Sequence, residues 1–180
     1  MVDLHLKLEY FARMLLPALA TLMFSILVMV PVGVVGIGNF PPDVCLISIY
    51  YWTIFRPTAM PFWFVFLLGI MQDALFGIAL GMSSLLFLLF RLLILSQLRH
   101  LTKESFWMIW IGFGLITIPM LFCQWVMASA YKGALLPWDD AAMQWAFTFG
   151  LYPLLHVTFN TLYRLLPPAG TGSKSHAPLL

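Results

Sequence analysis

Two charged residues stand inside the most apolar part of the chain. Asp73 lies in the segment GIMQDALFGIALGM, residues 69 to 82, and Arg91 follows in the next apolar run. A charged side chain within a membrane-embedded segment must find a partner or lose its charge, so both residues are candidates for a functional or structural role. In a hairpin centred near residue 79, Arg91 would lie about 9 Å deeper than Asp73. A simple ion pair between them is therefore not favoured.

A pattern of small residues surrounds Asp73. Gly69, Asp73, Gly77 and Gly81 recur every four residues. Small residues at this spacing let two helices approach closely, either within one bundle or between partners, and packing within the bundle is the commoner case. Gly77 and Gly81 are expected at the outer turn of the hairpin, where the Asp73 carboxylate would cap or brace the turn.

A second polar pattern lies nearer the C-terminus. Tyr152, His156, Asn160 and Arg164 also recur every four residues, and His156 and Asn160 are expected at a depth close to that of Arg91. The pattern fits either hydrogen bonds between helices, which are the commoner use of such residues, or a path for protons or a solute.

Catalytic and metal-binding patterns are not recognisable. His156 has no second histidine or carboxylate three or four residues away, and the motifs GxSxG, HExxH and GxxxxGK[ST] do not occur. Cys45 and Cys123 lack the spacing of metal ligands, so we expect them to serve in packing. The sequence therefore predicts a protein that is not an enzyme and that binds no metal or other cofactor.

The composition explains why chemically active residues are so few. Of the 180 residues, 62% are hydrophobic and 9% are charged, whereas about one quarter of an ordinary soluble domain is charged. Such a chain is expected to lie in a lipid bilayer and has no room for a soluble enzymatic domain. The formal net charge of +2 is too small, and the basic residues are too scattered, for a nucleic-acid partner.

Apolar helices must position these residues. They are expected at about 14 to 35, 43 to 56, 61 to 77, 82 to 98, 106 to 130 and 140 to 165. The second is short because Pro57 disfavours helical geometry at Arg56, so we expect it to be tilted, partly re-entrant or shielded by its neighbours. The predicted fold is an all-α, polytopic membrane protein with a six-helix transmembrane bundle. Its parts are a cytoplasmic N-terminal segment (1–13), the transmembrane domain (14–166) and a disordered cytoplasmic tail (167–180).

The placement of basic residues predicts the orientation, because Lys and Arg accumulate in short cytoplasmic loops. With a cytoplasmic N-terminus, that side holds seven of the nine basic residues, namely Lys7, Arg13, Arg56, Arg99, Lys103, Arg164 and Lys174. Both termini are therefore expected in the cytoplasm. The outer loops carry Asp43, Asp139 and Asp140, and at the last two positions an aspartate can cap the start of the last helix.

Residues 41 to 87 resemble the rod shape-determining protein MreD family of bacterial inner membranes. The stretch reads PPDVCLISIYYWTIFRPTAMPFWFVFLLGIMQDALFGIALGMSSLLF. The resemblance rests on the prolines before a short helix, the YYW of residues 50 to 52, the pair Arg56-Pro57, and the pattern GxxxDxxxGxxLG from Gly69 to Gly81. The helices outside this stretch agree only in length, hydropathy and a closing basic residue.

The resemblance implies a non-enzymatic, multi-pass subunit of the rod complex, or elongasome, in the cell inner membrane. It implies binding to the single-span protein MreC. Through that pair the protein would support the peptidoglycan synthase formed by RodA and a class B penicillin-binding protein, coordinated with MreB filaments. The candidate positions for a partner interface or for structure are Gly69, Asp73, Gly77, Gly81, Arg56, Arg91, His156 and Asn160.

The alternative function is a small-solute-binding membrane subunit of a vitamin transporter. The family is similar in fold to the substrate-binding subunits of energy-coupling-factor transporters, although a shared fold says little about function. A scaffold needs exposed small-residue or aromatic grooves for partner helices, whereas a transporter subunit needs an enclosed, outer-facing pocket with convergent polar groups. The short, acidic outer loops offer few specific ligands, which favours the scaffold.

Overall fold

The computed structural model describes residues 19–26, 42–77, 79–101 and 105–165, and within these ranges the chain is helical without strands. The elements are α2 (Val44–Phe55), a short 3-10 helix η1 (Pro57–Ala59), α3 (Phe62–Phe76), α4 (Met82–Leu101), α5 (Phe106–Lys132) and α6 (Trp138–Leu165). Residues 19–26 form one further helical segment. The all-α prediction is confirmed for the described part of the chain.

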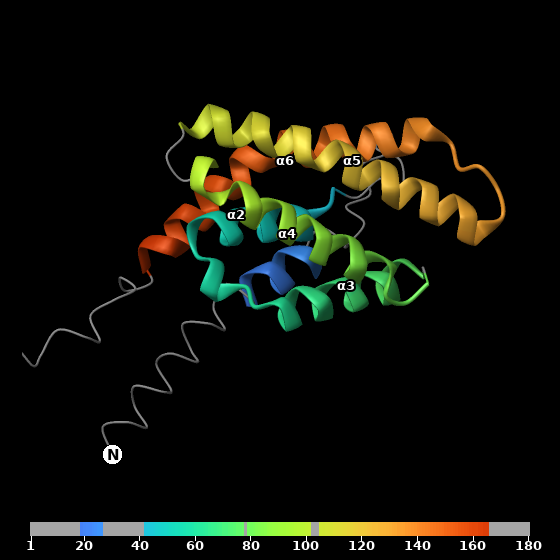
Figure 1. Cartoon of the computed structure of the whole chain (residues 1–180), viewed down its shortest axis with the longest axis horizontal. Coiled ribbons are helices and arrows are strands. Elements are labelled where there is room, and N and C mark those ends of the chain that lie inside the picture. The colour runs from blue at the N-terminus through green and yellow to red at the C-terminus, as the bar shows by residue number, and fades with distance from the viewer. Residues whose placement is uncertain (1–18, 27–41, 78, 102–104, 166–180) are drawn as a thin grey trace, which may run out of the picture.

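Two antiparallel hairpins form most of the fold (Figure 1). Helices α3 and α4 make one hairpin and α5 and α6 make the other. Both hairpins turn at the same end of the molecule, on the right in Figure 1, and the start of α2 points toward that end. We call this end, which holds residues 77, 79–81 and 133–137, the turn end. The candidate residues of the sequence are thereby divided between the turn end and the opposite end.

Helix α2 is the central helix. Eleven of its 12 residues are buried, and it contacts both α4 and α6. A helix that is apolar on all sides is normally buried on all sides, so its sequence accounts for its position. Twelve residues cover about 18 Å, less than the thickness of a bilayer core. Of the alternatives for this short helix, burial supports shielding by its neighbours.

Most predicted helix boundaries agree with the structure within a few residues, but α6 begins earlier than predicted. It starts at Trp138, so Asp139 and Asp140 lie in its first turn. The prediction that an aspartate caps this helix was therefore wrong, although carboxylates in a first turn still interact favourably with the helix dipole. The first predicted helix is described only at residues 19–26, and the predicted tail lies outside the described residues.

Helix α5 has the length and composition of a membrane span. Among the described residues it is the one helix long and apolar enough to cross a bilayer by itself, while α2, α3 and residues 82–98 of α4 are shorter apolar helices. Large apolar side chains on α5 are exposed, among them Leu115 and Phe122, as expected for a surface that faces lipid. The six spans and the cytoplasmic termini stay predictions.

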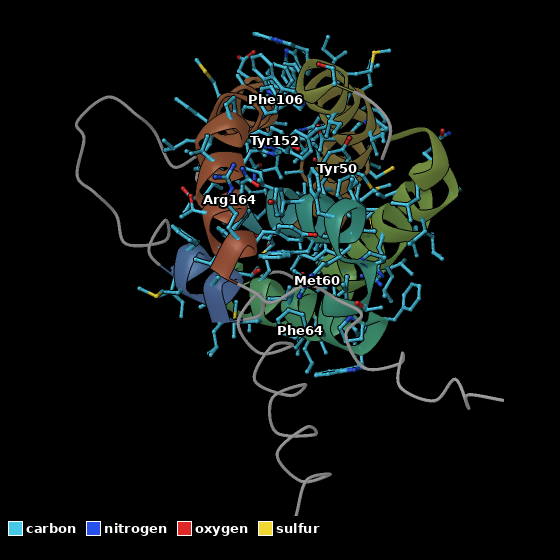
Figure 2. All side chains as sticks on the ribbon, turned by 90° about the vertical axis from the view of Figure 1, so that its left-hand side faces the viewer. Tyr50, Met60, Phe64, Phe106, Tyr152 and Arg164 are labelled. Atoms are coloured by element: carbon cyan, nitrogen blue, oxygen red, sulfur yellow. The ribbon has the colours of Figure 1, made fainter. Side chains whose placement is uncertain are left out.

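Aromatic side chains of α2, α5 and α6 fill one half of the core. The buried ring of Phe113 lies 5.1 Å from that of Tyr50 and 4.7 Å from that of Tyr152. The Tyr50 hydroxyl donates to the Ile109 carbonyl at 2.9 Å. Figure 2 shows Tyr50, Tyr152 and Phe106 gathered on one side of the bundle, away from Met60 and Phe64. Each such ring pair adds about 0.5–1.5 kcal/mol beyond its burial.

Candidate functional site

The Asp73 carboxylate closes the turn between α3 and α4. One of its oxygens accepts the backbone N–H of Gly81 at 2.7 Å, and the other accepts that of Ser83 at 3.0 Å. The Asp73 side chain is fully buried. It satisfies backbone donors at the start of α4 that have no partner within the helix. The turn-bracing role predicted for this residue is therefore confirmed.

The glycines of the four-residue pattern serve two different purposes. A Cβ atom at Gly69 would overlap the backbone of Ser84, so this glycine permits close contact between α3 and α4. At Gly77 and Gly81 an added Cβ would meet nothing within 4 Å, but φ is +63° and +99°. Gly77 ends α3 in the left-handed conformation that glycine adopts readily. The expectation that Gly77 lies at the turn is therefore confirmed, whereas the four-residue spacing does not place it on the close-packed face with Gly69.

Arg91 holds the connection between α2 and α3. Its Nη2 donates to the Pro57 carbonyl at 2.9 Å, and its guanidinium carbon lies 4.7 Å from the centre of the Phe62 ring. The side chain is buried. The similar depth expected for Arg91, His156 and Asn160 does not make them partners, because α2 packs against both α4 and α6. Residue counts along the chain give depth but not which helix intervenes.

The other candidates lie near the last turn of α2 and along α6. Arg56 follows α2 directly, and its guanidinium lies 5.3 Å from the centre of the Tyr163 ring on α6, a cation–π contact. His156 packs against Phe106, with 4.8 Å between ring centres, and its Nδ1 is buried without a hydrogen-bond partner. Asn160 is half-buried.

The polar pattern of α6 does not form a chain of hydrogen bonds. The Tyr152 hydroxyl, like the His156 Nδ1, is buried and lacks a hydrogen-bond partner. The rings of Tyr152 and His156 lie 5.8 Å apart within the aromatic core. These two residues therefore act through ring packing, and neither the predicted interhelical hydrogen bond nor a proton path is formed at them.

A polar contact that the sequence analysis missed joins the start of α2 to α3 and α6. Asp43 caps α2 by accepting the Leu46 N–H at 3.1 Å, and its second oxygen accepts from the Gln72 amide at 3.0 Å. The Asp43 N–H donates to the Thr148 hydroxyl at 3.0 Å. An aspartate between paired prolines and an apolar run is a helix-capping signal. Its partners 29 and 105 residues away have no such signal.

A cleft of about 370 Å³ lies beside this contact, between the end of α3 and the α5–α6 hairpin. We call it the polar cleft. Its lining includes three amides, three aromatic rings and two opposite charges, supplied by Gln72, Gln124, Gln144, Phe76, Trp125, Tyr131, Lys132 and Asp140. A cavity of about 30 Å³, lined in part by Asp43, adjoins it at Gln72, Phe76 and Gln144.

A second hollow, the apolar groove, adjoins the polar cleft along the contact between α5 and α6. It has a volume of about 520 Å³ and is lined by Ile118, Leu121, Phe122, Trp125, Trp138, Ala141, Ala142 and Trp145. Leu121, Trp125 and Ala141 line both hollows. The α5–α6 hairpin therefore lines a polar hollow with one set of its residues and an apolar hollow with another, and the three shared residues lie between them.

The described residues contain no group of three or more His, Cys, Asp and Glu that could hold a metal ion. Both cysteines are free, and Cys45 is buried with its sulfur 3.2 Å from the Ser25 hydroxyl. Cys123 is exposed, so the expected packing role fits Cys45 alone. The site chemistry available in this part of the chain is thus hydrogen bonding, charge and apolar contact.

Comparison with known protein families gives a match over most of the chain. The family model described as rod shape-determining protein MreD matches residues 7–157 of the 180 residues. The matched range includes the Asp73 turn, Arg91, the polar cleft and the apolar groove. No curated protein and no solved structure matches the chain.

Proposed function

Since the chain belongs to the MreD family of rod shape-determining proteins, we propose that it is a non-enzymatic, multi-pass subunit of the rod complex in the cell inner membrane. In this proposal it binds MreC and supports peptidoglycan synthesis for cell elongation. Contact with RodA, the class B penicillin-binding protein and MreB is indirect. Six spans with both termini in the cytoplasm are part of the same proposal.

The observation that carries this proposal is the family match over residues 7–157. The polar contacts agree with it. Asp73 and Arg91 bind backbone groups of their own chain, and Arg56 lies over a ring of its own chain. These side chains stabilise a bundle and do not converge on a reacting centre, as expected for a subunit that acts by holding partners.

The partner surface lies on an outer face of the bundle in this proposal. Gly69 already faces Ser84, so the glycine pattern of α3 is used within the chain and does not receive a partner helix. Exposed apolar side chains remain on several helices, among them Leu67 on α3, Leu115 on α5 and Leu154 on α6. A single-span partner binds by packing against such a face.

Photo-crosslinking in cells tests the proposal and locates the surface. A photoreactive residue is placed in turn at Leu67, Leu115 and Leu154, with buried Phe113 as the control position. We expect MreC to crosslink at one of the three exposed positions and not at Phe113. We also expect MreC and the synthase to co-purify with the intact protein from a mild detergent. Absence of MreC from both experiments would overturn the proposal.

A small-solute-binding subunit of a vitamin transporter is the alternative. The polar cleft bears on it because three amides and two charges line one hollow. However, Phe76, Tyr131 and Lys132 of its lining are exposed, whereas a vitamin-type subunit needs an enclosed pocket. Co-purification of a bound vitamin and an ATPase in place of MreC would favour this alternative.

A further inference from the structure

The two hairpins present exposed apolar surfaces of unequal height. Helix α3 has 15 residues and α5 has 27. The exposed apolar side chains of α3 extend from Phe62 to Phe76, which covers about 21 Å of helix axis. Those of α5 extend from Trp107 to Tyr131, which covers about 36 Å. Because the hydrocarbon core of a bilayer is about 30 Å thick, α3 is too short to cross it and α5 is long enough even when tilted.

Helices α4 and α6 show the same difference. On α4 the exposed face becomes polar at Ser96 and Gln97, about 21 Å from the first residue, Met82. On α6 exposed apolar side chains extend from Trp138 to Val157, about 28 Å. In Figure 1 the loop between α5 and α6 also reaches further to the right than the turn between α3 and α4. The apolar surface is therefore shorter on the α3–α4 side, and the turn end contributes to the difference.

The lining of the polar cleft is independent evidence for the depth that water reaches beside α3. Gln124 lines the cleft about 12 Å along the helix axis from Lys132, at the end of α5. Gln144 lines it about 9 Å from Trp138, at the start of α6. Phe76, in the last turn of α3, lines the same cleft. Amides at this depth need water or lipid headgroups, because hydrocarbon offers no hydrogen bonds.

Other residues of the same two helices are apolar at the same depth. Phe122 lies two residues before Gln124, yet it is exposed and lines the apolar groove. Trp145 follows Gln144 directly and also lines the groove. The side of the α5–α6 hairpin that faces α3 is therefore suited to water about 10 Å deeper than the side that bears the groove.

We infer that the protein thins the bilayer beside the α3–α4 hairpin. The leaflet at the turn end, which is the outer leaflet in the proposed orientation, lies about 10 Å deeper there than beside the apolar groove. Water and headgroups then reach the polar cleft. A bilayer thins around an apolar segment that is shorter than its hydrocarbon core, whereas a bilayer of constant thickness would place Gln72, Gln124 and Gln144 in hydrocarbon. This inference rests on the proposed function for its membrane placement and not for any partner.

A matched pair of cysteine variants on α5 tests the water boundary. The full chain with Cys123→Ser is reconstituted in phosphatidylcholine nanodiscs, and the rate of reaction with a charged, water-soluble methanethiosulfonate is measured. We expect Gln124→Cys to react at least about tenfold faster than Phe122→Cys, because a thiol in apolar surroundings forms little thiolate. Exposure alone predicts the reverse, since Phe122 is exposed and Gln124 is half-buried. If Gln124→Cys lowers the inserted amount, Gln144→Cys and Ala142→Cys form the replacement pair, in the cleft and the groove respectively.

Spin labels at matched heights test the position of the lipid. Ala74 lies two residues before Phe76 on α3, as Phe122 does before Gln124 on α5, so the two positions lie equally far below the cleft. Both are exposed. Collision rates with oxygen and with a water-soluble nickel chelate give the depth of each label. We expect the label at Ala74→Cys to lie near the headgroups and the label at Phe122→Cys to lie about 10 Å deeper.

Labels at Leu67→Cys and Leu115→Cys, at exposed positions in the central parts of α3 and α5, are the controls and should both lie deep in hydrocarbon. Water contact at both would overturn the proposed membrane placement and this inference with it. With both controls deep, equal depths at Ala74 and Phe122 would overturn the inference alone, because the bilayer would then have one thickness around the bundle. Equal reaction rates at Gln124 and Phe122 would do the same.

Discussion

The two hairpins turn at the same end of the molecule but are held together by different means. In the α3–α4 hairpin, Gly69 lets the backbones meet at Ser84, and Asp73 seals the turn. The α5–α6 hairpin is joined by rings: the Trp110 ring stacks on that of Phe149 at 4.8 Å, and its indole donates to the Phe149 carbonyl at 3.1 Å. In the first hairpin a glycine lies against backbone, whereas in the second the glycine, Gly114, lies against the ring of Phe149.

This difference decides where binding surfaces form. The separation of two packed helices follows the size of the side chains between them, and at Gly69 the backbones of α3 and α4 are in close contact. The large rings of α5 and α6 leave the polar cleft and the apolar groove beside theirs. The α5–α6 hairpin therefore lines both hollows, and the end of α3 contributes only to the polar cleft.

The largest effect is expected from a large side chain at Gly69, in the close contact between α3 and α4. Gly69→Leu forces a side chain against the Ser84 backbone, which should cost about 3 kcal/mol, the upper part of the usual range for overpacking. Gly150→Leu is the matched control, because Gly150 lies on α6 and an added Cβ would meet nothing within 4 Å. Its stability should change by about 0.5 kcal/mol or less.

Thermal unfolding in detergent and the amount of membrane-inserted protein measure both glycine variants. We expect Gly69→Leu alone to lower the melting temperature and the inserted amount. Equal behaviour of the two variants would show that the α3–α4 contact is as open as the outer face of α6, and the comparison between the hairpins would fail.

The sequence predicted the α3–α4 hairpin better than the α5–α6 hairpin. Small residues every four positions and a lone carboxylate are local signals, so the packing of Gly69 and the role of Asp73 could be predicted. Gly77 lies at the turn as predicted, but its spacing alone also suggested a place on the close-packed face, which the left-handed φ at the end of α3 excludes. The depth of Arg91 did not reveal its partner, because α2 packs against both α4 and α6. The polar cleft depends on residues distant in sequence, which no single segment reveals.

A smaller effect is expected from removing the Asp73 carboxylate that closes the turn between α3 and α4. Asp73→Ala removes the acceptor of the Gly81 and Ser83 N–H groups, and an unsatisfied buried donor costs about 1–3 kcal/mol. We expect a loss of about 2 kcal/mol and faster hydrogen exchange at both amides. Asp139→Ala, at an exposed position in the first turn of α6, serves as the control. Unchanged exchange at Gly81 and Ser83 would show that the carboxylate does not close the turn.

The smallest effect is expected from removing the Trp125 hydrogen bond that holds the loop between α5 and α6. Trp125→Phe keeps the ring in both hollows but removes the indole donor to the Leu136 carbonyl, one hydrogen bond worth about 1 kcal/mol. Hydrogen exchange should become faster at residues 133–137 and stay unchanged at Gly81 and Ser83, because the two turns are held by separate contacts. The backbone bonds from Gly133 to Ala130 and from Ala134 to Ser129 remain, so the loop should loosen without unfolding. If its exchange does not change, those two bonds alone hold the loop, and the wall of the polar cleft is set by the end of α5 and not by Trp125.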